Sequence, residues 1–98
     1  MIKQVEWSDG AIESVIKIKM YLVENWSELV AENFVNEIES KIEVLKQFPE
    51  IGRQSEKEKG VRRIKVAKHV ALYYREKNGT LEILDFFDQQ QHPDKSKY

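Results

Sequence analysis

The spacing of hydrophobic residues changes once along this chain of 98 residues, and the change limits the folds that the chain can adopt. From residue 12 to Phe48, apolar residues recur at intervals of three and four, which is the period of an amphipathic helix. From Val61 onward they alternate with polar or small residues, which is the period of a strand with one buried face. The sequence therefore predicts an α+β fold, in which helices cover one face of a sheet.

Two helices are predicted in the first half of the chain, after a short strand at residues 2–7. Ser8 or Asp9 offers an N-cap for a helix that runs to about Asn25, and Ser27 offers a cap for a second helix that Pro49 ends. The first helix has an apolar stripe, interrupted near Ile18 and Lys19, at Ile12, Val15, Ile16, Met20, Leu22, Val23 and Trp26. The stripe of the second is Val30, Ala31, Phe34, Val35, Ile38, Ile42, Leu45 and Phe48. So short a link predicts an antiparallel helical hairpin.

The second half predicts a small antiparallel sheet. Asn78-Gly79 lies between the strand-like runs 70–77 and 80–87, and both residues tolerate the positive φ of a type I′ hairpin turn. Around residues 67–69 no glycine marks a turn, so the run 61–77 is either two strands or one bent strand. The predicted order is β-α-α-β-β-β in a single domain of residues 1–98, with a polar tail after Phe87.

The period of two assigns side chains to the two faces of this sheet. The residues expected to face the helices are Arg62, Ile64, Val66, Val70, Leu72 and Tyr74. Those expected on the opposite, helix-free face are Arg63, Lys65, His69, Ala71, Tyr73 and Arg75. Arginine donates in a planar fork to phosphate or carboxylate, and tyrosine can stack on a base, so this face is a candidate binding surface. A solvated face is the alternative.

Charge is distributed unevenly along the chain. Residues 1–52 carry five Lys/Arg and ten Asp/Glu, whereas residues 53–77 carry nine and three, a local net charge of +6. A solvated loop and strand edge would also account for this basic block. The chain has no cysteine and two isolated histidines, so we expect no disulfide, no metal site and no cofactor. With no apolar run of membrane-spanning length and no signal peptide, we expect a cytoplasmic protein with no membrane contact.

Several stretches resemble the RelE/ParE superfamily of bacterial toxins, also called plasmid stabilisation proteins. They are the helix end L-K-Q-F-P-E-I-G-R at 45–53, the strands V-R-R-I-K-V at 61–66 and H-V-A-L-Y-Y-R at 69–75, and L-E-I-L-D-F-F-D at 81–88. Gln91-His92-Pro93 resembles the end of ParE-like members, where a D-x-R-Q-x-P segment is usual. The resemblance implies a toxin of a type II toxin–antitoxin system that a cognate antitoxin holds inactive in a hetero-oligomer.

The superfamily includes ribosome-dependent mRNA interferases, whose chemistry needs cations around the phosphate and a group that moves protons. Arg63 and Lys65 resemble the basic pair of these members. Two further arginines are replaced, by Ala71 and Gln90. The remaining candidates for catalysis are Arg75, which would compensate in part, and His92 and Tyr98, which would act as acid or base.

Poisoning of DNA gyrase, the activity associated with ParE-like members, needs a binding surface and no catalytic set. The incomplete nuclease set therefore favours a non-enzymatic, ParE-like toxin. The alternatives are a RelE-like endoribonuclease acting on ribosome-bound mRNA, and a non-toxic degenerate member or interaction module. Arg63, Lys65, Tyr73 and Arg75 are the predicted antitoxin- or target-binding residues. Leu29 and Trp26 are weaker candidates for contacts. A tryptophan at a helix junction, such as Trp26, is expected to pack in the core.

Overall fold

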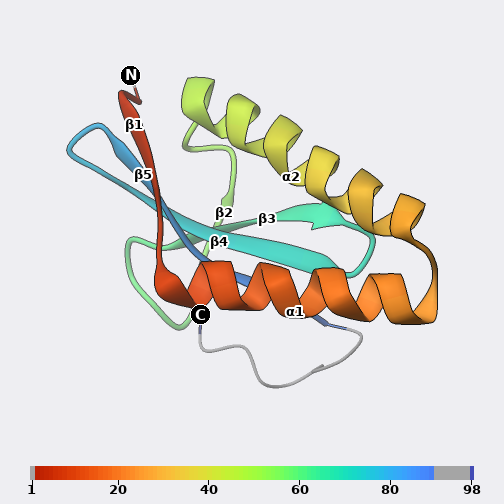
Figure 1. The fold of residues 1–98 in the computed structure, drawn as a ribbon. Coiled ribbons are helices and arrows are strands. Elements are labelled where there is room, and N and C mark those ends of the chain that lie inside the picture. The colour runs from red at the N-terminus through yellow and green to blue at the C-terminus, as the bar shows by residue number, and fades with distance from the viewer. Residues whose placement is uncertain (1, 90–97) are drawn as a thin grey trace.

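A computed structural model describes residues 2–89 and residue 98, and its elements follow the predicted order with one addition (Figure 1). The elements are β1 (Gln4–Trp7), α1 (Asp9–Asn25), α2 (Glu28–Gln47), β2 (Arg53–Gln54), β3 (Arg62–Ala67), β4 (Val70–Lys77) and β5 (Thr80–Asp88). The predicted α+β class is confirmed. The short strand β2 was not predicted, because two residues are too few to carry a period.

The five strands form one sheet in the order β1-β5-β4-β3-β2. Three of the four pairings are antiparallel, as predicted, but β1 runs parallel to β5, with Val5 opposite Leu81. The sheet is therefore mixed. Alternation alone cannot reveal this pairing, because β1 and β5 are separated by more than 70 residues in sequence.

The predicted hairpin turn is confirmed, since Asn78 and Gly79 have φ of 52° and 82°. The run 61–77 forms two strands, β3 and β4, joined at Lys68 and His69, and it is not one bent strand. Both predicted serine caps are also present. The Ser8 Oγ accepts from the Ala11 N–H at 3.0 Å, and the Ser27 Oγ accepts from the Val30 N–H at 3.1 Å. These bonds satisfy N–H groups that a helix start leaves without partners.

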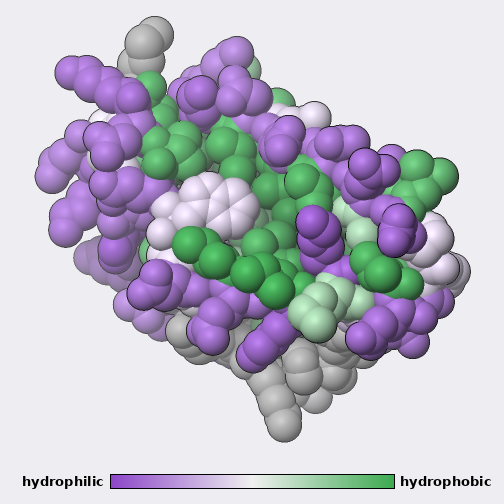
Figure 2. Space-filling model, viewed as in Figure 1, coloured by the Kyte–Doolittle hydropathy of each residue, from purple (hydrophilic) through white to green (hydrophobic). Residues whose placement is uncertain are grey.

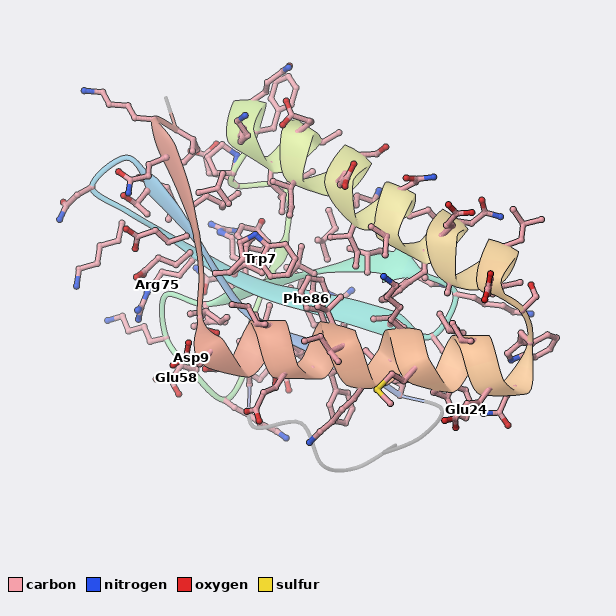
Figure 3. All side chains as sticks on the ribbon, viewed as in Figure 1. Trp7, Asp9, Glu24, Glu58, Arg75 and Phe86 are labelled. Carbon is pink, nitrogen blue, oxygen red and sulfur yellow. The ribbon has the colours of Figure 1, made fainter. Side chains whose placement is uncertain are left out.

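The main core lies between the helical hairpin and the sheet. Its most buried side chains include Phe34, Ile38 and Leu45 from α2, and Leu72, Tyr74, Leu81 and Ile83 from the strands. The predicted faces of β3 and β4 are confirmed, because Val66, Val70, Leu72 and Tyr74 all belong to this core. Figure 3 shows Trp7 and Phe86 between the diverging ends of the two helices, with ring centroids 5.3 Å apart.

The predicted buried stripe of α1 is largely wrong. Ala11 and Ile18 are its buried residues, and Val15 and Leu22 are partly buried. The rest of the stripe is exposed, with fractions of 43% for Ile12, 50% for Ile16, 57% for Met20, 41% for Val23 and 69% for Trp26. The small Ala11 side chain lets α1 approach the sheet on a neighbouring face of the helix. An apolar row on the outer surface of α1 results, and apolar patches are visible there in Figure 2.

The stripe of α2 is confirmed at Ala31, Phe34, Ile38, Ile42 and Leu45, while Val30 and Phe48 at its ends are exposed. Among the described residues, neither helix combines the length and apolar character that crossing a membrane requires.

Candidate binding face

A group of cations lies on the helix-free face where β2 and β3 meet. The short pairing of these strands places Arg53 directly opposite Arg63, and Lys65 follows two residues later on the same face of β3. Arg53, Arg63, Lys65 and Lys68 line a cleft of about 400 Å³ together with His69 and Gln89. We call this site the cationic cleft. Of the described residues that line it, none is an aspartate or glutamate.

The cleft cations lack carboxylate partners within the described part of the chain. The two ion pairs found among the described residues lie elsewhere. They are Lys46–Glu43 on α2 and Arg75–Glu82 between β4 and β5. Like charges directly opposite across two strands destabilise a sheet. The Arg53–Arg63 pair therefore favours an anion as the ligand of this face.

The loop before Arg53 is held in place by Tyr74, whose hydroxyl donates to the Pro49 carbonyl and accepts from the Gly52 N–H, both at 2.8 Å. Arg62 adds a bond of 2.7 Å to the Gly52 carbonyl. Burial raises the pKa of Tyr74 above its usual value of 10.0, although the Gly52 hydrogen bond opposes the shift. A Cβ at residue 52 would overlap the Tyr74 hydroxyl, so this close approach requires glycine. These contacts fix the position of Arg53.

The prediction that Tyr73 lies on the helix-free face is correct, but the residue is not available for stacking. Its exposed fraction is 3%, and it forms a second, smaller cluster with Val61 and Ala71, against which Leu84, Phe87 and Tyr98 pack. The Tyr98 ring lies 5.5 Å from the Tyr73 ring, and the Ser55 hydroxyl donates to the Tyr98 carbonyl. This apolar cluster therefore covers part of the helix-free face, which the alternation pattern predicted to be exposed to solvent.

The remaining predicted site residues are not gathered into one centre. Arg63 and Lys65 line the cleft, whereas the Arg75 Nε lies 2.7 Å from a Glu82 carboxylate oxygen, toward the β4–β5 turn (Figure 3). Tyr98 borders a neighbouring pocket with Arg53 and Arg63. His92 and Gln90 lie outside the described residues. Ala71, the position at which the resemblance implies an arginine in nuclease members, is buried, with an exposed fraction of 7%.

Three cleft residues were missed as candidates from the sequence: Arg53, Lys68 and Gln89. Arg53 is the last residue of the stretch 45–53 that carries the family resemblance, and this position could have identified it as a candidate. Lys68 and Gln89 follow strands in sequence, and only the packing of the turns brings them beside Arg63. Among the described residues, no three potential metal ligands lie together.

A second surface lies beside the β3–β4 turn, at the closed end of the helical hairpin. A pocket of about 490 Å³ is lined on the helix side by Ile18, Leu22, Trp26, Val30 and Phe34, and on the sheet side by residues that include Lys68, His69 and Asp88. We call it the Trp26 pocket. The prediction that Trp26 packs in the core is wrong, since it is 69% exposed, and Leu29 nearby in sequence is 65% exposed. Lys68 and His69 border both this pocket and the cationic cleft.

The chain matches a protein family in sequence and several solved structures in fold. Residues 5–93 match the family described as "ParE toxin of type II toxin-antitoxin system, parDE". A chain of the chromosomal ParDE toxin–antitoxin system from P. aeruginosa superposes with a TM-score of 0.77 at 22% identity, over 89% of this chain and 96% of that one.

YafQ from E. coli strain BL21(DE3) superposes with a TM-score of 0.57 at 15% identity, and a YafQ mutant from E. coli with 0.58 at 14%. Each of these superpositions covers 93% of this chain and 97% of that one. None of the curated proteins matches the chain. Because the family match extends over nearly the whole chain, the protein belongs to the ParE toxin family of type II toxin–antitoxin systems.

Proposed function

We propose that the protein acts by binding DNA gyrase, and that a cognate antitoxin neutralises it in a toxin–antitoxin hetero-oligomer. The observation that carries the proposal is the state of the helix-free face. It offers cations at Arg63 and Lys65, but Ala71 is buried and Tyr73 is covered by its neighbours. Such a face suits the binding of a macromolecule better than phosphate chemistry, which needs several converging donors and a proton carrier.

We further propose that the antitoxin contacts two surfaces. An apolar side chain of the antitoxin would enter the Trp26 pocket, while its acidic side chains would form ion pairs with Arg63 and Lys65 in the cationic cleft. The shared border at Lys68 and His69 allows one segment to cross from the pocket to the cleft. Arg75 would lie at the edge of this contact. Because it is paired with Glu82, the antitoxin would contact it either beside Glu82 or with a carboxylate that takes the place of Glu82. Tyr73 would take part after displacement of Tyr98.

The proposed target is tested by inducing the chain in cells with and without a cognate antitoxin. We expect growth arrest with double-strand breaks and an SOS response when the antitoxin is absent. In vitro, the purified chain should inhibit gyrase supercoiling or trap cleaved DNA. Arg63→Glu/Lys65→Glu should weaken antitoxin binding and toxicity, whereas Lys17→Glu/Lys19→Glu, an equal charge change on exposed positions of α1, should leave both unchanged.

Two results would contradict the proposal. Unimpaired growth at high soluble expression would favour a non-toxic member or an interaction module. Rapid loss of mRNA with cleavage at translated codons would favour a RelE-like mRNA interferase, the alternative that the cations of the cleft support. Charge reversal at Arg63 and Lys65 that changed neither antitoxin binding nor toxicity would exclude these residues from the contact surface.

A further inference from the structure

We infer that the cationic cleft binds the phosphodiester backbone of duplex DNA, without reading its sequence. This binding is a property of the isolated toxin and does not require gyrase. Its role rests on the proposed function in one respect, because a toxin bound to gyrase would hold the enzyme's DNA through this cleft.

The first support is the arrangement of the cations. Arg53 and Arg63 are opposite each other on β2 and β3, at the roughly 5 Å separation of cross-strand partners. Lys65 lies two residues beyond Arg63, about 7 Å along the strand, which equals about two base-pair rises. Lys68 extends the group to the β3–β4 turn. Three or four phosphates can therefore be neutralised together, and a phosphate between Arg53 and Arg63 relieves the repulsion across the strands.

The second support is the excess of donors at the rim of the cleft. Arginine and lysine side chains donate hydrogen bonds and cannot accept them. A phosphodiester backbone offers acceptor oxygens and no donors, so it complements such a rim. An extended peptide would bring backbone N–H groups that need acceptors, and of the described side chains in the cleft only Gln89 and a neutral His69 supply one. The side chains of the cleft therefore suit phosphate oxygens, and in an antitoxin segment they suit its carboxylates and not its backbone N–H groups.

The third support distinguishes duplex from single-stranded nucleic acid. Proteins that bind single strands stack the bases on exposed aromatic side chains. The described lining of the cationic cleft contains no phenylalanine, tyrosine or tryptophan, and Tyr73 beside it is buried against Tyr98. A site that contacts the backbone through several cations and has His69 as the one aromatic ring of its described lining suits a duplex, whose bases are already stacked.

The fourth support is the segregation of charge between the two layers. Helix α2 carries five glutamates and two lysines, whereas the segment 53–77 has a net charge of +6. The acidic excess of α2 thus belongs to the helical layer, and the cleft opens on the other face of the sheet. A chain with a net charge of −1 can still approach DNA when its basic face is turned toward the duplex.

The test is fluorescence anisotropy of a labelled short duplex with the purified full-length chain. We expect binding at low salt that weakens roughly 40- to 150-fold between about 50 and 200 mM salt, as neutralisation of three to four phosphates requires. Arg63→Gln/Lys65→Gln should reduce the magnitude of the log–log salt slope by about 2. The matched control Lys17→Gln/Lys19→Gln changes the net charge equally on α1 and should retain the wild-type slope. Circular dichroism verifies that both variants are folded.

Four results would overturn the inference. They are an absence of duplex binding at low salt, equal weakening by the cleft and control variants, preference for a single strand or an RNA hairpin over duplex DNA, and binding of a polyglutamate peptide without binding of DNA. The gyrase supercoiling assay tests the proposed target and not this inference. A chain that inhibits gyrase but does not bind duplex DNA by itself contradicts this inference alone, and one that binds DNA without inhibiting gyrase contradicts the proposed target alone.

Discussion

At the scale of single residues, the binding face depends on a tyrosine that does not belong to it. Tyr74 is fully buried, and its hydroxyl joins the Pro49 carbonyl to the Gly52 N–H. These bonds set the path of the chain from the end of α2 into β2, where Arg53 lies. The neighbouring residue, Tyr73, lies on the opposite face, where it lines the neighbouring pocket with Arg53 and Arg63.

Replacing Tyr74 by phenylalanine should destabilise the fold by about 1–3 kcal/mol, because a buried N–H and a partly buried carbonyl lose their partner. Urea unfolding followed by circular dichroism measures the change. Tyr21→Phe is the control, since Tyr21 is partly buried and its replacement should change the free energy of unfolding by less than about 0.5 kcal/mol. Equal effects of the two variants would show that the hydroxyl bridge contributes nothing.

The raised pKa of Tyr74 predicts a dependence of stability on alkaline pH. The folded state keeps this phenol protonated at pH values where the unfolded chain ionises, so the stabilisation is complete below about pH 10 and declines as the pH rises toward the folded-state pKa. The wild-type free energy of unfolding should therefore fall above pH 10 by up to about 1.4 kcal/mol per pH unit more than that of Tyr74→Phe. Parallel curves for the two proteins would refute this linkage.

At the scale of elements, α1 shows that an apolar stripe and a buried face need not coincide. Ile12, Ile16, Met20 and Val23 have helical spacing, yet they lie on the exposed side. Both the caps and the bounds of α1 and α2 followed from local sequence, because capping involves residues a few positions apart. The rotation of α1 about its axis did not follow, since it depends on which face the sheet accommodates.

This rotation can be tested by paired truncations on α1. Ile18→Ala should cost about 2–5 kcal/mol, because Ile18 is 4% exposed and its removal leaves a cavity between α1 and the core. Ile16→Ala should cost less than about 1 kcal/mol, because half of that side chain already contacts water. Chemical denaturation of both variants gives the comparison. A larger loss for Ile16→Ala would mean that the helix is rotated as the sequence pattern first indicated.

At the scale of the whole molecule, the β3–β4 turn is the point where the two candidate surfaces meet. The cationic cleft lies on one side of Lys68 and His69, and the Trp26 pocket lies on the other. A partner that covers both surfaces would block DNA and target together. Such blocking would follow from the border at Lys68 and His69 that the pocket and the cleft share.

Trp26→Ala tests this arrangement. Because Trp26 is 69% exposed, its loss should change the free energy of unfolding little, while antitoxin binding should weaken by about 2 kcal/mol or more if the residue anchors the partner. Isothermal titration calorimetry with the cognate antitoxin measures the affinity, and duplex binding through the cleft should remain at the wild-type level. Unchanged antitoxin affinity would remove the Trp26 pocket from the interface.

The sequence by itself determined the parts of this protein that depend on neighbours along the chain. The helix caps, the type I′ turn at Asn78-Gly79, the alternation that separates Arg63 and Lys65 from Val66, and the family resemblance are all local signals. The tertiary structure decided the parts that depend on distant residues. It paired Arg53 with Arg63, buried Tyr73 under Tyr98, exposed Trp26, and placed β1 parallel to β5. Burial and charge proximity depend on contacts between segments that the periodicity of one segment cannot specify, so the candidate site emerged only from the packing of the sheet.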